Sequence, residues 1–136
     1  MTVTLTKYHG LGNDFLVCDT REVPVDADWV ALARAWCERR RGMGADGLLS
    51  LTLLGDAATT TELAMVLHNA DGSRAEMSGN GIRCLVHAAF IAQQRNEPVT
   101  YRVHTDAGLR SVDVVPDDTP GQATTAPVTS VHASVA

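Results

Sequence analysis

The chain has 136 residues, of which 45% are hydrophobic and 20% charged, a composition typical of one soluble domain with a buried core. A formal net charge of −5 and an aromatic content of 4% argue against a nucleic-acid partner, which needs a basic face or a base-stacking surface. No run of about 18 apolar residues predicts a membrane span and no apolar leader follows Met1, so we expect no membrane association and a cytoplasmic protein.

The first segments predict a strand pair followed by a helix. Alternating side chains in TVTLTKYHG, residues 2–10, predict a half-buried strand, and Asp14–Asp19 predicts its return strand, with Asn13 and Asp14 at the tip of the hairpin. The segment DWVALARAWCERR repeats apolar residues at helical spacing after an aspartate N-cap, either Asp26 or Asp28. Gly42 is expected to end this region in a left-handed conformation, and the basic run 39–41 is interpreted as a solvated helix end.

The central part predicts two further strands and a second helix. Gly47–Leu54 and Glu62–Asp71 are apolar enough for buried strands, and GDAATTT separates them as a turn. In the helix that follows, GNGIRCLVHAAFIAQQRN, apolar residues cover so much of the circumference that burial on most sides is expected. The segments VTYRVHT and RSVDVV predict a closing hairpin around 106–108.

These elements together predict a mixed α/β (α+β) domain over residues 1–116, with mostly antiparallel strands wrapped around a central helix. Residues 117–136 are rich in Thr, Ala, Ser and Pro. They are expected to form either a tail or a marginal strand that leads toward a second domain absent from this sequence.

Two motif matches fail on their context. GMGADG fits the GxGxxG pattern of dinucleotide-binding loops, but here a helix precedes it and a strand follows, which is the reverse of the required order. EMSGN lacks the glycine two residues before the serine that a hydrolase elbow needs, because Glu76 occupies that place. The three cysteines, Cys18, Cys37 and Cys84, have no CxxC spacing, so neither a zinc site nor a disulfide framework is indicated.

The start of the second helix, NADGSRAEMSGNGIRC, is more informative. Ser78 stands at the N-cap position, where unpaired N–H groups and the positive end of the helix dipole stabilise an anion. Glycines permit a close approach of a ligand to the backbone, and Asn69 and Asn80 offer amide groups on either side of the turn. The structural alternative, that Ser78 is only a helix cap and the glycines only form turns, fits the stretch equally well.

Three blocks in this order resemble the diaminopimelate epimerase family. They are KYHGLGNDFLVCD, RRRGMGADGLL and NADGSRAEMSGNGIRC, and they cover most of residues 7–92. The resemblance implies an isomerase of lysine and cell-wall biosynthesis that interconverts LL- and meso-diaminopimelate without cofactor or metal. It also implies two similar domains that face each other across the substrate, each with one catalytic cysteine at a helix start.

Carried onto this chain, the resemblance makes Asn13 and Asn69 substrate-binding residues, and it makes Gly79 and Asn80 the group that holds the α-carboxylate. Asp46 lies in a block that often contacts substrate in the family. Ser78 occupies the position of the first catalytic cysteine, and the second domain is absent, so we expect the chain alone to be inactive. It would then need a second epimerase domain or a homodimer partner.

Cys84 is not expected to replace the missing thiol. It lies six residues after Ser78, about 240° around a helix, and would face elsewhere. Like Cys18 and Cys37, it is expected to be a packed core thiol. The alternatives to an epimerase half are a non-catalytic small-molecule binding or interaction domain that kept the fold, and an isomerase of the phenazine-biosynthesis type.

Overall fold

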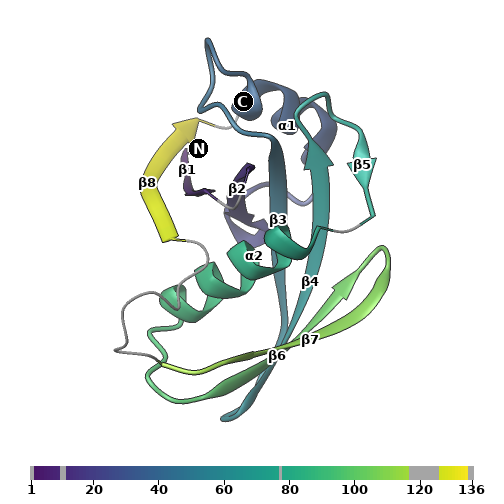
Figure 1. Ribbon diagram of the computed structural model, residues 1–136. Coiled ribbons are helices and arrows are strands. Elements are labelled where there is room, and N and C mark those ends of the chain that lie inside the picture. Colours follow the sequence, from purple (N-terminus) through teal and green to yellow (C-terminus); the bar gives the residue numbers. More distant parts are fainter. Residues whose placement is uncertain (1, 10–11, 77, 117–125, 135–136) are drawn as a thin grey trace.

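A computed structural model describes residues 2–9, 12–76, 78–116 and 126–134. Eight strands and two α-helices, with one 3-10 turn, make up the described chain (Figure 1). They are, in chain order, β1 Thr2–His9, β2 Asp14–Asp19, η1 Thr20–Glu22, α1 Trp29–Cys37, β3 Gly47–Asp56, β4 Thr60–Asn69, β5 Arg74–Ala75, α2 Gly79–Ala92, β6 Val99–Thr105, β7 Gly108–Val114 and β8 Ala126–Ser134.

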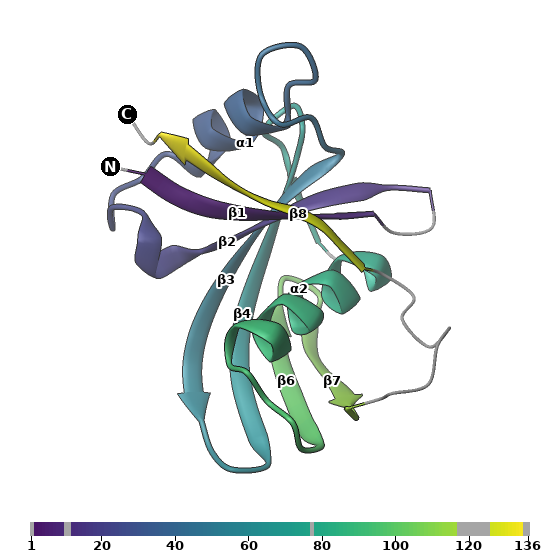
Figure 2. The same ribbon diagram turned by 90° about the vertical axis from the view of Figure 1, so that its left-hand side faces the viewer.

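The strands form one sheet in the order β7-β6-β4-β3-β2-β1-β8, with β5 paired to β4. Two pairings, β2 with β3 and β4 with β6, are parallel, and the other five are antiparallel. The two parallel connections contain α1 and α2, as such crossovers require. Figures 1 and 2 show the sheet curving around α2, which confirms the predicted fold of strands wrapped around a central helix.

The inner core lies between α2 and the concave face of the sheet. Helix α2 buries one broad face, which includes Ile82, Leu85 and Phe90, while Arg83 and Ile91 on the opposite side are exposed. On β4 the buried side chains alternate, with Leu63, Met65 and Leu67 turned toward α2. The predicted burial of α2 is therefore confirmed for one broad face, while the opposite face is open to solvent.

A second core lies on the other face of the sheet, beneath α1. Trp36 and Cys37 of α1 pack with residues of β1, β2 and β3 that include Leu5, Leu16 and Leu48. Because β2 has helices on both sides, its residues Asp14–Cys18 are all buried. Asp28 caps α1, since its side chain accepts a hydrogen bond from Ala31 N at 3.1 Å, which selects Asp28 between the two predicted caps.

Two expectations around the end of α1 are wrong. Gly42 does not adopt a left-handed conformation, because the helix already ends at Cys37 and the positive φ, +77°, falls on Gly44. Glu38 turns the chain by accepting hydrogen bonds from the main-chain N–H groups of Arg40 and Arg41. Gly42 instead packs under the last helical turn, where a Cβ would lie 2.7 Å from Trp36 O and nearer still to Ala35 O.

The basic run is also not a uniform solvated helix end. Arg39 lies beyond the helix and pairs with the carboxylates of Asp14 and Asp46, while Arg40 and Arg41 are exposed. The other predicted elements differ from the structure only in their bounds, since β3 extends to Asp56 and α2 ends at Ala92. The short strand β5 and the turn η1 were not predicted.

Within the tail, residues 126–134 form β8, which pairs with β1 along its length. The predicted division at residue 116 stays a prediction, and residues 117–125 lie outside the described part of the chain. Among the described residues, no helix has the length and apolar character that crossing a membrane requires.

Candidate functional site at the start of α2

Ser78 is the N-cap of α2. Its backbone is extended, with φ −140° and ψ 125°, and its Oγ accepts a hydrogen bond from Gly81 N at 3.0 Å. The Ser78 carbonyl accepts the first helical hydrogen bond from Ile82 N at 2.9 Å. Helix geometry leaves the N–H groups of Gly79 and Asn80 without an acceptor inside the helix, so these two donors remain for a ligand.

Space for a ligand exists directly at this helix start. Gly79 is exposed, and a Cβ built on it would meet no atom of the described residues within 4 Å beyond its own helical turn. Gly81 behaves differently, because its Cβ would lie 3.2 Å from Ser78 Cβ and 3.3 Å from Leu49 Cδ2. One glycine therefore leaves room outside the helix, and the other lets the helix start pack closely on β3.

Asn13 and Asn80 are brought together from segments far apart in the sequence. Asn80 Nδ2 donates a hydrogen bond to Asn13 Oδ1 at 3.2 Å. This contact ties the start of α2 to the chain just before β2, and Figure 2 shows that β2 begins on the side of the molecule where α2 starts. Of the residues assigned through the family resemblance, Ser78, Gly79, Asn80 and Asn13 form one cluster.

Asn69 lies at the same end of the sheet but makes a separate contact. It is the last residue of β4, and the sheet register places Gly47 of β3 between it and Phe15 of β2. Its Nδ2 donates to Ser73 Oγ at 3.1 Å within the turn that follows β4. No hydrogen bond joins the Asn69 side chain to the Asn13 and Asn80 pair in the described part of the structure.

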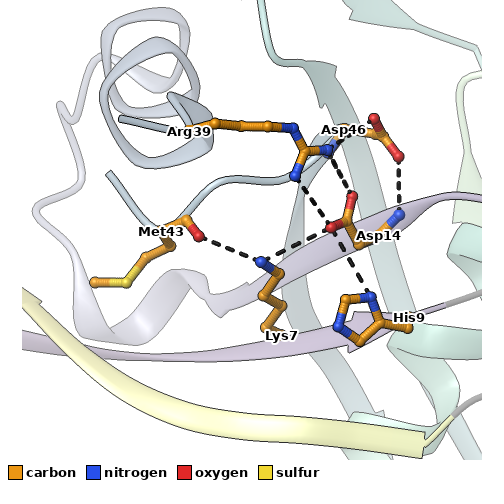
Figure 3. A network of polar contacts seen from close by, with 6 residues as sticks. All are labelled: Lys7, His9, Asp14, Arg39, Met43 and Asp46. Carbon is orange, nitrogen blue, oxygen red and sulfur yellow. Dashed lines mark hydrogen bonds and ion pairs between the residues drawn. The ribbon is translucent and has the colours of Figure 1, made fainter. Parts of the chain in front are cut away.

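A charged network that the motifs did not predict adjoins this cluster (Figure 3). Its centre is the Asp14 carboxylate, which is 11% exposed. Arg39 Nη2 lies 3.1 Å from Asp14 Oδ1, Lys7 Nζ lies 3.7 Å from Oδ2, and His9 Nδ1 lies 3.9 Å from Oδ2. Lys7 Nζ also donates to the carbonyl of Met43 at 3.3 Å.

The pKa of Asp14 reflects this environment. Burial raises the pKa of the carboxyl, but hydrogen bonds and the positive charges of Arg39 and Lys7 outweigh it and lower the value to about 2. Asp14 is therefore a fixed anion at neutral pH. Sequence spacing gave no signal for this network, because Asp14 and its partners Arg39 and Asp46 are 25 and 32 residues apart along the chain.

The three cysteines are buried, as predicted, and each is a free thiol. Burial raises the pKa of Cys18 to about 12 and that of Cys37 to about 11, so neither is a thiolate at neutral pH. Cys84 is fully buried on α2. Within the described residues, no three His, Cys, Asp or Glu side chains lie close enough together to hold a metal ion.

Solved structures show which class of fold this is. The chain is similar to a hydroxyproline epimerase from Agrobacterium vitis, with a TM-score of 0.63 and 18% sequence identity over 86% of this chain and 38% of that one. At such an identity the likeness defines the fold alone.

The sequence defines the family. The diaminopimelate epimerase family model matches residues 5–131, and the chain belongs to this family. It is 45% identical over 121 residues to diaminopimelate epimerase 1 of Nostoc sp., covering 86% of this chain and 41% of that protein. It is 47% identical over 111 residues to the diaminopimelate epimerase of Microcystis aeruginosa, covering 79% of this chain and 38% of that protein. The chain thus spans about 40% of the length of these relatives and matches their N-terminal half.

Proposed function

We propose that this chain supplies one half of the active site of a cytoplasmic diaminopimelate epimerase, and that the chain alone does not turn over substrate. The observation that carries the proposal is the start of α2, where two helical N–H groups without an intrahelical acceptor, a space at Gly79 that the described residues leave open, and the Asn13–Asn80 pair meet. An α-carboxylate fits this environment, because helix starts stabilise anions and amide groups fix the orientation of a carboxylate.

In this proposal four residues, Asn13, Asn69, Gly79 and Asn80, bind and orient substrate, and we call them the half-site. Gly79 and Asn80 hold the α-carboxylate at the helix start, and Asn13 and Asn69 contact the remaining polar groups. Removal of the weakly acidic α-proton then requires a base on one face of the α-carbon and a proton donor on the other. A cofactor-free epimerase needs both groups from protein side chains.

Ser78 stands where the family resemblance places the first of these bases. A thiol at a helix start has a lowered pKa and ionises near neutral pH, whereas a serine hydroxyl does not. In addition, Ser78 Oγ already accepts the capping hydrogen bond from Gly81 N. The position thus retains the shape of the site without an effective base.

The other group must come from outside this chain. Relatives are more than twice as long as the segment that matches, so a second epimerase domain can supply the opposite face of the substrate. A second copy of this chain is the alternative partner, and it would bring another Ser78 in place of a thiol.

The test follows the α-proton of LL-diaminopimelate by NMR in D2O. We expect the chain to bind the substrate without α-proton exchange or epimerisation. The Ser78→Cys variant, mixed with the C-terminal part of the Nostoc epimerase, is expected to exchange and invert the α-carbon, while the unmodified chain in the same mixture is not. Steady turnover by the unmodified chain alone would overturn the predicted inactivity, and failure to bind would overturn the assigned ligand.

Ser78 also favours a second candidate function, a non-catalytic domain that binds a small amino acid or a related anion. The Ser78→Cys mixture separates the two candidates. Ligand binding without any α-proton exchange in that mixture, under conditions in which the full-length Nostoc enzyme is active, would support the binding domain.

A further inference from the structure

Asp14 and Asp46 bind each other's main chain. Asp14 N donates to Asp46 Oδ2 at 2.9 Å, and Asp46 N donates both to Asp14 Oδ1 at 3.1 Å and to the Asp14 carbonyl at 2.9 Å. Two carboxylates held this close repel each other unless a cation lies between them. Arg39 provides it, since its Nη2 lies 3.1 Å from Asp14 Oδ1 and 3.2 Å from Asp46 Oδ1 (Figure 3). We call Asp14, Arg39 and Asp46 the carboxylate clasp.

The clasp holds the backbone next to two of the three asparagines of the half-site, Asn13 and Asn69. Asn13 precedes Asp14 in the chain, so the hydrogen bonds of Asp14 fix the backbone that carries Asn13. On the other side, the Asp46 carbonyl accepts a hydrogen bond from Ala70 N at 3.1 Å, and Ala70 follows Asn69. Each asparagine is therefore one residue away from a backbone group that the clasp holds.

Stability alone does not account for the contact of Arg39 with Asp46. Arg39 pairs with Asp46 at a position where both side chains are exposed, by 57% and 47%, and ion pairs of this kind contribute little to the free energy of unfolding. Its two contacts nevertheless link segments 25 and 7 residues away along the chain. A guanidinium is suited to such a link, because its planar fork can serve two carboxylates at once, which an ammonium does less well.

We propose that Arg39 is a positioning residue for the half-site: it holds Asn13 and Asn69 at the spacing that binding requires, acting through Asp14 and Asp46. The inference rests on the proposed function for the role of the two asparagines, while the positioning itself can be measured without any ligand.

The test compares Arg39→Gln with Arg40→Gln in the full chain. Arg40 is the matched control, because it is exposed and its side chain has no ion pair with any described residue. Three quantities are measured: the side-chain amide resonances of Asn13, Asn69 and Asn80, the dissociation constant for LL-diaminopimelate, and the thermal midpoint. Arg39→Lys is included as the conservative variant.

For Arg39→Gln we expect shifted Asn13 and Asn69 amide resonances, with Asn80 following through its hydrogen bond to Asn13. We also expect affinity weakened roughly tenfold and only a small fall of the thermal midpoint, because small displacements of positioning groups cost more binding than stability. Arg39→Lys is expected to be intermediate, and Arg40→Gln to match the unmodified chain. Unchanged asparagine resonances in Arg39→Gln would overturn the proposal, as would changes spread over the whole spectrum with a large loss of thermal stability. If the unmodified chain binds no diaminopimelate but Arg39→Gln still moves these resonances, positioning stands and only the proposed function fails.

Discussion

The two helices begin with the same local structure and differ in what surrounds it. In α1 the Asp28 carboxylate accepts a hydrogen bond from Ala31 N at 3.1 Å, and in α2 the Ser78 hydroxyl accepts one from Gly81 N at 3.0 Å. Asp28 brings its own negative charge to the positive end of its helix. Ser78 is neutral and is followed by Gly79, outside which the described residues leave open space. The α1 start is therefore already compensated, whereas the α2 start can accept an external anion.

The two helices also contribute to the site at opposite ends. Helix α2 contributes its N-terminus, while α1 contributes the segment beyond its C-terminus, where Arg39 meets Asp14 and Asp46. A capping residue at a helix start thus does not by itself identify a binding site. Charge and free space at that start decide which helix end can bind a ligand.

The largest expected effect comes from Ser78→Cys, which replaces the neutral cap with an ionisable group. We expect one thiol that reacts rapidly with a disulfide reagent at pH 7, with a pKa about one unit or more below the usual 8.5, because the helix start stabilises the thiolate. The measurement is the reaction rate as a function of pH. The native cysteines provide the baseline, since all three are at most 1% exposed.

Ser111→Cys is the control for this variant. Ser111 is exposed on β7 and lies at no helix start, so its thiol should titrate in the ordinary range. If the thiols at positions 78 and 111 titrate at the same pH, the start of α2 does not stabilise a negative charge. The proposed difference between the starts of α1 and α2 would then be wrong.

Ser78→Asp makes α2 begin as α1 does. The aspartate keeps a capping oxygen and adds a charge that the helix dipole favours, so the free energy of unfolding is expected to stay equal or rise by about 0.3–1 kcal/mol. The affinity for LL-diaminopimelate is expected to fall more than about tenfold, because two anions would compete for one helix start. Calorimetric titration measures this affinity. Asp28→Ser is the control and should bind LL-diaminopimelate as the unmodified chain does. Undiminished binding by Ser78→Asp would place the carboxylate elsewhere.

Sequence reasoning identified the parts of the fold that depend on local rules. The alternation in the first strand, an aspartate cap at residue 26 or 28 and the apolar character of α2 are all written in neighbouring residues. The structure confirms the alternation, selects Asp28 as the cap and buries one broad face of α2. Gly42 shows the limit of such rules. Its position after a helix suggested a left-handed stop, but Glu38 ended the helix earlier, and Gly42 is required for close packing instead.

The same distinction applies to the site. Ser78, Gly79 and Asn80 lie in one stretch, so their shared position at a helix start could be predicted. The carboxylate clasp could not, because it depends on the parallel pairing of β2 with β3, which places Phe15 beside Gly47 and therefore Asp14 beside Asp46. No periodicity in the chain specifies that pairing.

Acid titration tests the ion pair between Asp14 and Arg39, which lies in the segment that follows α1. Since the pKa of Asp14 is lowered to about 2, its charged form stabilises the fold above the ordinary pKa of an aspartate, and this stabilisation is lost as the pH falls from about 4 toward 2. The loss is expected to be on the order of 2 kcal/mol for the unmodified chain. Arg39→Gln should show a shallower dependence in the same range, and Arg40→Gln should not. Denaturant unfolding at several pH values measures how the free energy of unfolding depends on pH. If this dependence is the same for all three proteins, Arg39 does not stabilise the charged form of Asp14.

The smallest effects concern the two caps themselves. Asp28→Ala and Ser78→Ala each remove one capping hydrogen bond, so each should lower the free energy of unfolding by about 1 kcal/mol. Asp28→Asn keeps the acceptor oxygen of the cap and removes only its charge. It should therefore lose only the interaction of that charge with the helix dipole, which lowers the free energy of unfolding by about 0.3–1 kcal/mol and by less at high salt. Denaturant unfolding at low and high salt measures all three. The Ser78→Ala loss should not depend on salt, because a neutral hydroxyl is lost. A salt-dependent Ser78→Ala loss, or an Asp28→Asn loss as large as that of Asp28→Ala, would contradict the distinction drawn between a charged and a neutral helix start.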